Sequence, residues 1–254
     1  MRFLCVLSVL AGLSACAAPD STTPERPPRP GQPGGGGGGG GGDLDDTGST
    51  EDTDREDSEE PEANPNADDD GDGWTNGEEW DQNTDDSDPD DHPYAGGYDI
   101  DDCRWEVSGE GNNEGQVVDN FKLTDQHGEQ VRLYDFCDQV VVVVSSAGWC
   151  GPCQSEARWL AGLEDKYGDR GLRIVTLLAE DSSGQTPNQS DLQGWASMAG
   201  FDAQPVLADT NWSISSRFER DGYIPTVSLL APGLELVEKD GDVSENDIKA
   251  VLPD

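Results

Sequence analysis

The stretch from Val140 to Glu156 constrains the fold of this chain more than any other. Five consecutive valines, Val140–Val144, predict a strand that is buried on both faces, because a half-exposed strand would alternate apolar with polar residues. A helical segment, Cys150–Tyr167, follows shortly afterwards. Its apolar residues recur at the spacing of one helix face: Ala157, Leu160, Ala161 and Leu163. A buried strand that runs directly into a helix is typical of an α/β domain.

The junction between this strand and this helix carries two cysteines, Cys150 and Cys153. A thiol at a helix N-terminus faces unpaired N–H groups and the positive end of the helix dipole, and both favour the thiolate. Pro152 suits the first helical turn because its φ angle is already fixed there. Cys153 lies one turn deeper and can reach the first sulfur. The pair therefore predicts a two-thiol redox centre. Half of a zinc site is disfavoured, because the sequence has no second Cys/His pair at ligand spacing.

Several segments resemble the thioredoxin superfamily, and in particular its redoxin branch. The sequence Trp149-Cys150-Gly151-Pro152-Cys153 is similar to the thioredoxin active-site motif. Further segments match the N-terminal hairpin, the glutamate after the second cysteine and the cis-proline loop of that branch: Phe121–Asp125 with His127–Val131, Glu156, and Ile224-Pro225-Thr226. The resemblance covers Gln116 to about Leu252, with Ser145-Ser146 where the branch usually carries aromatic residues. It implies a thiol–disulfide oxidoreductase of the cell envelope, like the tethered reductases of cytochrome c maturation.

The resemblance also implies a catalytic sequence of events. Cys150 would attack a substrate disulfide as a thiolate, and Cys153 would then resolve the mixed disulfide. A cis bond before Pro225 would place the backbone of Ile224 and Thr226 beside the thiols. An extended substrate could pair there as an added strand.

Two residues near the thiols keep two interpretations each. Glu156 is either a proton-transfer group for the second cysteine or a helix-surface residue. Trp149 either shields the thiols and offers an apolar contact, or only packs. The redox chemistry needs no cofactor beyond the cysteine pair. The expected partners are protein disulfide substrates and a membrane thiol that donates electrons, most simply with this chain as the reductant.

The rest of the C-terminal half alternates strands and helices. The pattern predicts a hairpin, a second long strand, a helix, a short strand, a helix, a closing hairpin and a last helix: Val117–Thr124 with Gln130–Phe136, Leu172–Leu178, Ser190–Ala199, Pro205–Leu207, Trp212–Phe218, Thr226–Leu230 with Leu234–Glu238, and Ser244–Leu252. We expect Ser190 and Ser244 to cap their helices, with Asp247 completing a capping box. Residues 103–254 are thus predicted to form an α/β, thioredoxin-like fold, a central mixed sheet flanked by helices.

The charge of the chain is regional. The net charge is −39, and about 26 of the 54 acidic residues lie between Asp43 and Asp102, opposed there only by Arg55. Such acidity excludes nucleic acid as a partner, because phosphates are bound by basic surfaces. It suits a solvated tether or a cation ligand.

The first 16 residues have the features of an exported lipoprotein. Arg2 precedes an apolar run, Phe3–Leu13, that is too short for a permanent membrane span, so residues 1–15 are predicted to be a signal peptide. Leu13-Ser14-Ala15-Cys16 resembles the bacterial lipoprotein box, which implies acylation of Cys16 and loss of Cys5 with the peptide. The alternative is an ordinary secretory signal. We therefore expect a lipid-anchored protein of the bacterial cell envelope, facing the periplasm or the surface.

Residues 16–65 are predicted to be a disordered linker. A proline-rich start leads into the glycine run Gly34–Gly42 and then into an acidic Ser/Thr stretch. None of this can bury enough apolar surface to offset the entropy of ordering. A flexible coil of about 50 residues reaches roughly 40 Å, enough to hold a folded part away from a membrane.

Residues 66–93 are predicted to contain a calcium loop. The segment Asp68–Glu79 fits the pattern D-x-D-x-D-G-x5-E without a mismatch. Calcium takes about six to eight oxygen ligands, with glycine at the sharp turn and a late bidentate carboxylate. The expected ligands are the side chains of Asp68, Asp70, Asp72, Asn76 (directly or through water) and Glu79, and the carbonyl of Trp74. The residues that follow, Trp80–Asp90, resemble thrombospondin type 3-like calcium repeats. The alternative is a solvated acidic run.

Two further cysteines, Cys103 and Cys137, remain. In an oxidising compartment they would form a bridge that pins the entry of the domain to its first hairpin. The alternative is two unpaired thiols, because sequence alone does not fix connectivity.

Three functions are consistent with these features. The favoured one is a membrane-tethered thiol–disulfide oxidoreductase. A peroxiredoxin-type thiol peroxidase would need a threonine three residues before its reactive cysteine, and Ala147 stands there. A calcium-dependent binding lipoprotein with an inert thioredoxin-like fold is the non-enzymatic alternative, and the intact cysteine pair argues against it.

Overall fold

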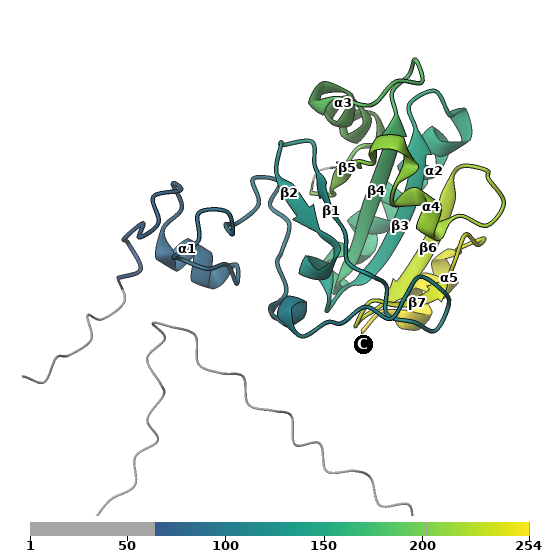
Figure 1. Cartoon of the computed structure of the whole chain (residues 1–254). Coiled ribbons are helices and arrows are strands. Elements are labelled where there is room, and N and C mark those ends of the chain that lie inside the picture. The colour runs from purple at the N-terminus through teal and green to yellow at the C-terminus, as the bar shows by residue number, and fades with distance from the viewer. Residues whose placement is uncertain (1–63, 202, 254) are drawn as a thin grey trace, which may run out of the picture. The chain divides into compact units, whose positions relative to one another are not determined.

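The valine run forms the middle strand of a five-stranded mixed sheet. In the computed structural model, which describes residues 64–201 and 203–253 (Figure 1), this strand is β3, Val140–Ala147. The predicted signal peptide, the lipidation site Cys16 and all but the last residues of the predicted linker lie outside the described residues. The described residues belong to one unit, Asn64–Asp254.

The strand order of the sheet is β5-β4-β3-β6-β7. The strands β3, β4 and β5 are parallel, whereas β6 is antiparallel to β3 and β7 is antiparallel to β6. The bounds are Leu172–Glu180 for β4, Val206–Ala208 for β5, Thr226–Ala231 for β6 and Glu235–Glu238 for β7. A separate two-stranded hairpin pairs β1, Lys122–Thr124, with β2, Gln130–Arg132. The prediction of a mixed central sheet is confirmed.

Five α-helices and four 3₁₀ turns complete the described part of the chain. The helices are α1 (Asn76–Asp81), α2 (Gly151–Tyr167), α3 (Gln189–Ala199), α4 (Ser215–Phe218) and α5 (Glu245–Val251). The 3₁₀ turns are η1 (Asp102–Trp105), η2 (Leu133–Phe136), η3 (Gly168–Arg170) and η4 (Thr210–Trp212). No helix among residues 64–201 and 203–253 is long and apolar enough to cross a bilayer.

The valines of β3 feed two hydrophobic cores, because alternate side chains of a strand point to opposite faces. Val140, Val142 and Val144 pack with residues of α2, α3 and α5. Val141 and Val143 pack on the other face with the hairpin, α4 and the segment 94–100. All five are at most 1% exposed, and each buried valine contributes about 1.5–3 kcal/mol relative to an exposed one. The run is hydrophobic throughout because both faces are covered, as predicted.

Several predicted elements differ from the structure at their ends. The strand expected over Val117–Thr124 begins only at Lys122, because Val117 pairs instead with Glu235 in an isolated bridge. The strand expected over Gln130–Phe136 ends at Arg132, since the Asp135 carboxylate accepts a hydrogen bond from Arg132 N (3.2 Å) and residues 133–136 form a 3₁₀ turn. The cap of α3 is Asn188 rather than Ser190, because its side chain reaches the N–H groups of Ser190 and Asp191. The cap and capping box expected for α5 at Ser244 and Asp247 are confirmed.

The helix expected over Trp212–Phe218 is shorter, because it begins only at Ser215. Asn211 and Trp212 have positive φ angles of 60° and 57°, which break any helix that includes them. The fully buried Asp209 then accepts hydrogen bonds from the N–H groups of Ile214 and Ser215, and these bonds fix the start of α4.

A disulfide joins Cys103 in η1 to Cys137 just before β3. The bridge ties the segment that enters the domain to the first core strand. Cys137 is fully buried, and its carbonyl accepts a hydrogen bond from Gly233 N (2.7 Å) in the β6–β7 turn. The entry segment is therefore bonded covalently to Cys137, and one backbone hydrogen bond holds Cys137 to the β6–β7 turn.

We expect this bridge to contribute strongly to stability, because it closes a long loop in the unfolded chain. The two cysteines are 34 residues apart. The double substitution Cys103→Ser/Cys137→Ser should lower the free energy of unfolding by about 3 to 4.7 kcal/mol in urea denaturation. The matched control is Cys150→Ser/Cys153→Ser, whose bridge spans only three residues and should matter much less. Equal losses in the two variants would contradict the loop-closure explanation.

Candidate functional site

The end of β3 delivers Cys150 to the N-terminus of α2. Cys150 is the N-cap of this helix, with φ −84° and ψ 103°, and Pro152 occupies its first turn. Gly148 precedes it at a point where the chain passes the loop after β4, and a Cβ there would lie 2.6 Å from Ser182 N and 2.7 Å from the Asp181 carbonyl carbon. Glycine is required by this close approach, and it sets the position of the cysteine that follows.

The sulfur atoms of the two cysteines lie together beneath the surface. Cys150 and Cys153 form a disulfide, with Cα atoms 5.3 Å apart, and are 4% and 0% exposed. The backbone N–H of Cys153 donates to Cys150 Sγ at 3.2 Å. A backbone N–H of the first helical turn thus points at the sulfur of Cys150. This is the position at which the sequence predicts a stabilised thiolate.

The loop before β6 reaches the thiols from the other side of the site. The Ile224–Pro225 peptide bond is cis, and the Ile224 carbonyl oxygen lies 3.9 Å from Cys150 Sγ. Thr226 opens β6 and pairs in register with Ser145 of β3. The structure therefore brings Ile224 to the sulfur, whereas the backbone of Thr226 already belongs to the sheet.

Trp149 is held at the edge of the site by a residue that sequence reasoning missed. Its indole N–H donates to Glu180 Oε2 at 2.7 Å, and its side chain is 54% exposed. The other oxygen of Glu180 accepts from the indole N–H of Trp212 at 3.3 Å. Glu180 ends β4, next to the end of β3, and only the sheet pairing could have identified it. Trp149 does not pack into the core.

Glu156 lies on α2, one turn after Cys153, and so on the same helix face. Its side chain is half-buried. Burial raises the pKa of this carboxyl, and the neighbouring Asp242 carboxylate raises it further. A carboxyl that holds its proton to a higher pH than usual is suited to exchange protons with a nearby thiol.

A second candidate site is the acidic loop before α1. Ligand oxygens of Asp68, Asp70 and Asp72 all lie within 4.8 Å of one another. Each aspartate uses its Oδ1 atom to accept a backbone N–H of the loop: Gly71 N at 2.7 Å, Asp72 N at 3.1 Å and Trp74 N at 2.8 Å. The Oδ2 atoms of Asp70 and Asp72 are buried without a hydrogen-bond partner. Gly73, at the sharp turn of the pattern, has φ +106°.

Glu79 is the most deeply buried carboxylate next to this loop. It is fully buried, and neither carboxylate oxygen has a hydrogen-bond partner. Burial raises its pKa to about 7, and the carboxylates of Asp70 and Asp72 add to the effect. An unpaired buried carboxylate beside other carboxylates is costly. A bound divalent cation would satisfy all of them.

Asn76 forms two hydrogen bonds with Asp69 of the same loop. Its side-chain amide donates to Asp69 Oδ2 at 2.9 Å and accepts from Asp69 N at 3.1 Å. Both groups of the amide are thereby used within the loop. Of the predicted ligands, the structure brings together the carboxylates of Asp68, Asp70 and Asp72.

These features together define a class of protein. A central mixed sheet, a long helix that begins at the first of two neighbouring cysteines and a cis-proline beside them are the features of a thioredoxin-like fold. Residues 115–245, just over half of the chain, match the model of the AhpC/TSA family. The chain belongs to the AhpC/TSA family.

Two individual proteins show what this chain resembles more specifically. The chain is 30% identical over 132 residues to thiol-disulfide oxidoreductase ResA of Bacillus thuringiensis subsp. konkukian, a match that covers 51% of this chain and 66% of that protein. A Bacillus anthracis protein of the same name is 28% identical over 131 residues, 52% of this chain and 67% of that one. The match with the first of these relatives therefore spans just under two thirds of its length.

Solved structures are similar as well. The thioredoxin domain of a thiol-disulfide oxidoreductase from Bacteroides vulgatus has a TM-score of 0.45 and 20% identity to this chain, covering 55% of this chain and 98% of that domain.

Proposed function

We propose that this protein is a thiol–disulfide oxidoreductase that reduces protein disulfides through Cys150 and Cys153. The observation that carries the proposal is the position of Cys150 Sγ at the cap of α2, 3.2 Å from the N–H of Cys153. The ResA relatives carry the corresponding name. In the reduced protein this N–H and the helix dipole favour the thiolate, which is the attacking form.

The exchange proceeds in two displacements. The Cys150 thiolate attacks one sulfur of a substrate disulfide, and that S–S bond breaks as the other substrate sulfur leaves and takes up a proton. Cys153 then loses its proton and attacks Cys150 Sγ, which releases the second substrate thiol. Two electrons have passed to the substrate, and the enzyme is left with the Cys150–Cys153 disulfide. A membrane-bound thiol donor would return the dithiol form.

One backbone carbonyl and two side chains would assist this exchange reaction. The Ile224 carbonyl, 3.9 Å from Cys150 Sγ, is placed to meet the backbone of an extended substrate, with Thr226 fixing the strand behind it. The exposed indole of Trp149 offers a flat apolar contact beside the sulfur. Glu156 would serve as the proton-transfer group for Cys153, because the helix places it one turn after that residue and burial raises the pKa of its carboxyl.

Replacement of Cys150 by serine should abolish catalysis of insulin disulfide reduction with dithiothreitol as the electron source. The nucleophile is lost, so the rate should fall to that of dithiothreitol alone. Cys153→Ser should instead trap a mixed disulfide with the substrate, visible by mass spectrometry. A Cys150→Ser protein with the full wild-type rate would sink the proposal. Consumption of peroxide with no reduction of insulin would identify a thiol peroxidase, and inactivity in both assays a binding protein.

Replacement of Glu156 by glutamine should slow the resolving step and change its pH dependence. The carboxylate acts as a base only when deprotonated. In the wild type, resolution should therefore slow as the pH falls through the raised pKa of Glu156, and this limb should vanish in Glu156→Gln. Above that pKa the variant should resolve on the order of 100-fold more slowly. Asp165→Asn, an exposed position on the same helix, is the control and should leave both the rate and the pH profile unchanged. Identical profiles in Glu156→Gln and wild type would show that Glu156 is only a structural residue.

We further propose that the protein is anchored in the bacterial cell envelope by lipid on Cys16. The lipoprotein-like Leu13-Ser14-Ala15-Cys16 sequence supports this, as does the oxidised Cys103–Cys137 pair, since structural disulfides belong to oxidising compartments. Residues 16–65 would act as the tether between lipid and folded unit.

We also propose that the acidic loop binds Ca²⁺. The fully buried Glu79, with two unpartnered oxygens, favours a cation over a merely solvated acidic run. Asp68, Asp70 and Asp72 would supply further carboxylate oxygens and Trp74 its carbonyl.

Replacement of Glu79 by glutamine should weaken calcium binding in isothermal titration calorimetry by more than about 10-fold, the lower bound for losing even an outer-shell partner. The charge-matched control is the exposed neighbour Glu78→Gln, because glutamine also completes the capping box that Glu78 forms with Thr75. Equal calcium affinities in the two variants would contradict the assignment of Glu79 as a ligand.

A further inference from the structure

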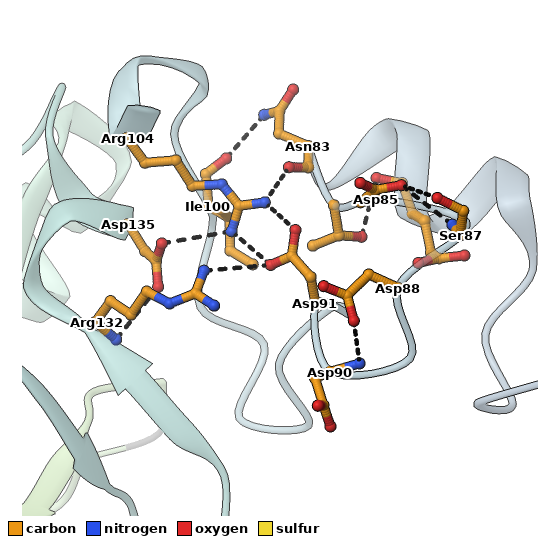
Figure 2. A network of polar contacts seen from close by, with 12 residues as sticks. Asn83, Asp85, Ser87, Asp88, Asp90, Asp91, Ile100, Arg104, Arg132 and Asp135 are labelled. Atoms are coloured by element: carbon orange, nitrogen blue, oxygen red, sulfur yellow. Dashed lines mark hydrogen bonds and ion pairs between the residues drawn. The ribbon is translucent and has the colours of Figure 1, made fainter. Parts of the chain in front are cut away.

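A buried ion-pair network joins residues 66–93, the segment of the acidic loop, to residues 103–254, the redox domain (Figure 2). At its centre is Arg104 of η1, whose side chain is 3% exposed. Its guanidinium bonds both oxygens of Asp91, at 2.9 and 2.5 Å, and lies 3.4 Å from Asp135 Oδ1. Asp91 and Asp135 are 8% and 0% exposed. Arg132 of β2 adds a second guanidinium, 3.4 Å from Asp91. Two positive and two negative groups are thus held between the loop segment and the redox domain.

The network is connected to Glu79 through the backbone after α1. The Glu79 carbonyl accepts hydrogen bonds from Thr84 N at 2.9 Å and Thr84 Oγ1 at 3.3 Å. The preceding residue, Asn83, offers its carbonyl to Arg104 Nη2 at 2.9 Å. The Asn83 side chain donates to the Ile100 carbonyl at 2.8 Å. A shift of Glu79 therefore displaces groups that Arg104 and Ile100 hold.

On its other side, the network leads to the central strand. Asp135 lies in η2, and its second oxygen accepts Tyr94 OH at 2.5 Å and Arg132 N at 3.2 Å. Cys103, the neighbour of Arg104, is bridged to Cys137, which follows η2 and stands three residues before β3. The path from the loop to the strand that positions Cys150 consists of buried and partly buried polar contacts, short stretches of backbone and the Cys103–Cys137 disulfide.

We infer that calcium occupancy of the acidic loop is energetically coupled, through Arg104, to the stability of the redox domain. The inference rests on the proposed calcium site. Without a cation, the loop carboxylates repel one another and the buried Glu79 carboxylate has no partner, so the loop is driven to open. Opening of the loop moves α1 and Asn83, and this weakens the hydrogen bond between the Asn83 carbonyl and Arg104. With the cation bound, α1 is fixed and the network is complete.

Because calcium binding and docking are thermodynamically linked, the coupling can be measured either as calcium affinity or as stability of the docked arrangement. If calcium stabilises the docked arrangement by some factor, docking must raise the affinity for calcium by the same factor. Calcium should therefore protect β3 against exchange, and disruption of the network should weaken calcium binding, although no network residue is a proposed ligand.

The test compares full-length wild type, Arg104→Met and Asn83→Gly. Asn83 has φ +59°, which glycine adopts without strain, so Asn83→Gly removes the bond to Ile100 and leaves every charge in place. It remains informative if Arg104→Met fails to fold because Asp91 and Asp135 lose their partner. Arg170→Met, an exposed arginine on η3, is the matched control. The readouts are calcium affinity by calorimetry and peptide-resolved hydrogen exchange of β3 with calcium or with EDTA.

We expect calcium to slow exchange in β3 of the wild type and of Arg170→Met, with little effect in Arg104→Met. Calcium affinity should fall at least about fivefold in Arg104→Met, the low end of typical coupling, and by a smaller factor in Asn83→Gly. Suppose that the wild type binds calcium, but the affinities of both network variants lie within about twofold of the wild-type affinity, or calcium leaves the exchange of β3 unchanged. The coupling is then wrong, and the calcium site stands. If the wild type binds no calcium, the calcium site itself is wrong and the coupling falls with it.

Discussion

The burial of β3 on both faces is the constraint on which the rest of the structure depends. Its five valines pack into two separate cores, with α2, α3 and α5 on one face and the hairpin and α4 on the other, so the strand is held from both sides. Its end is therefore fixed in space, and Gly148 allows the chain to turn close against the loop after β4. The packing of β3, rather than contacts made by Cys150 itself, places this cysteine at the cap of α2. A reactive sulfur that must meet a helix terminus needs this kind of rigid support.

Much of the redox domain could be predicted from sequence because its signals are local. The unbroken valine run, the helical spacing after Cys150 and the Ser244–Asp247 capping box each identify one element from adjacent residues. The failures came where a side chain from a neighbouring turn decided the backbone. Asp135 ends β2 early, and Asp209 delays the start of α4.

The candidate sites show the same division. The cysteine pair, Ile224, Pro225 and Glu156 could be predicted as one site because the resemblance to the redoxin branch links them. Glu180 was missed, because only the parallel pairing of β3 and β4 brings it to Trp149. In the acidic loop the residue spacing correctly grouped three aspartates, but the pairing of Asn76 with Asp69 depends on side-chain geometry that no spacing records. Arg104 has no sequence signal, since its partners Asp91 and Asp135 lie 13 and 31 residues away.

The carboxylate of Glu180 is shared by two indoles, those of Trp149 and Trp212. One of these rings borders the sulfur pair and the other lies in the turn after β5. Because the two rings bond different oxygens of one carboxylate, Glu180 holds the ring beside the sulfurs and the turn after β5 to the same strand end.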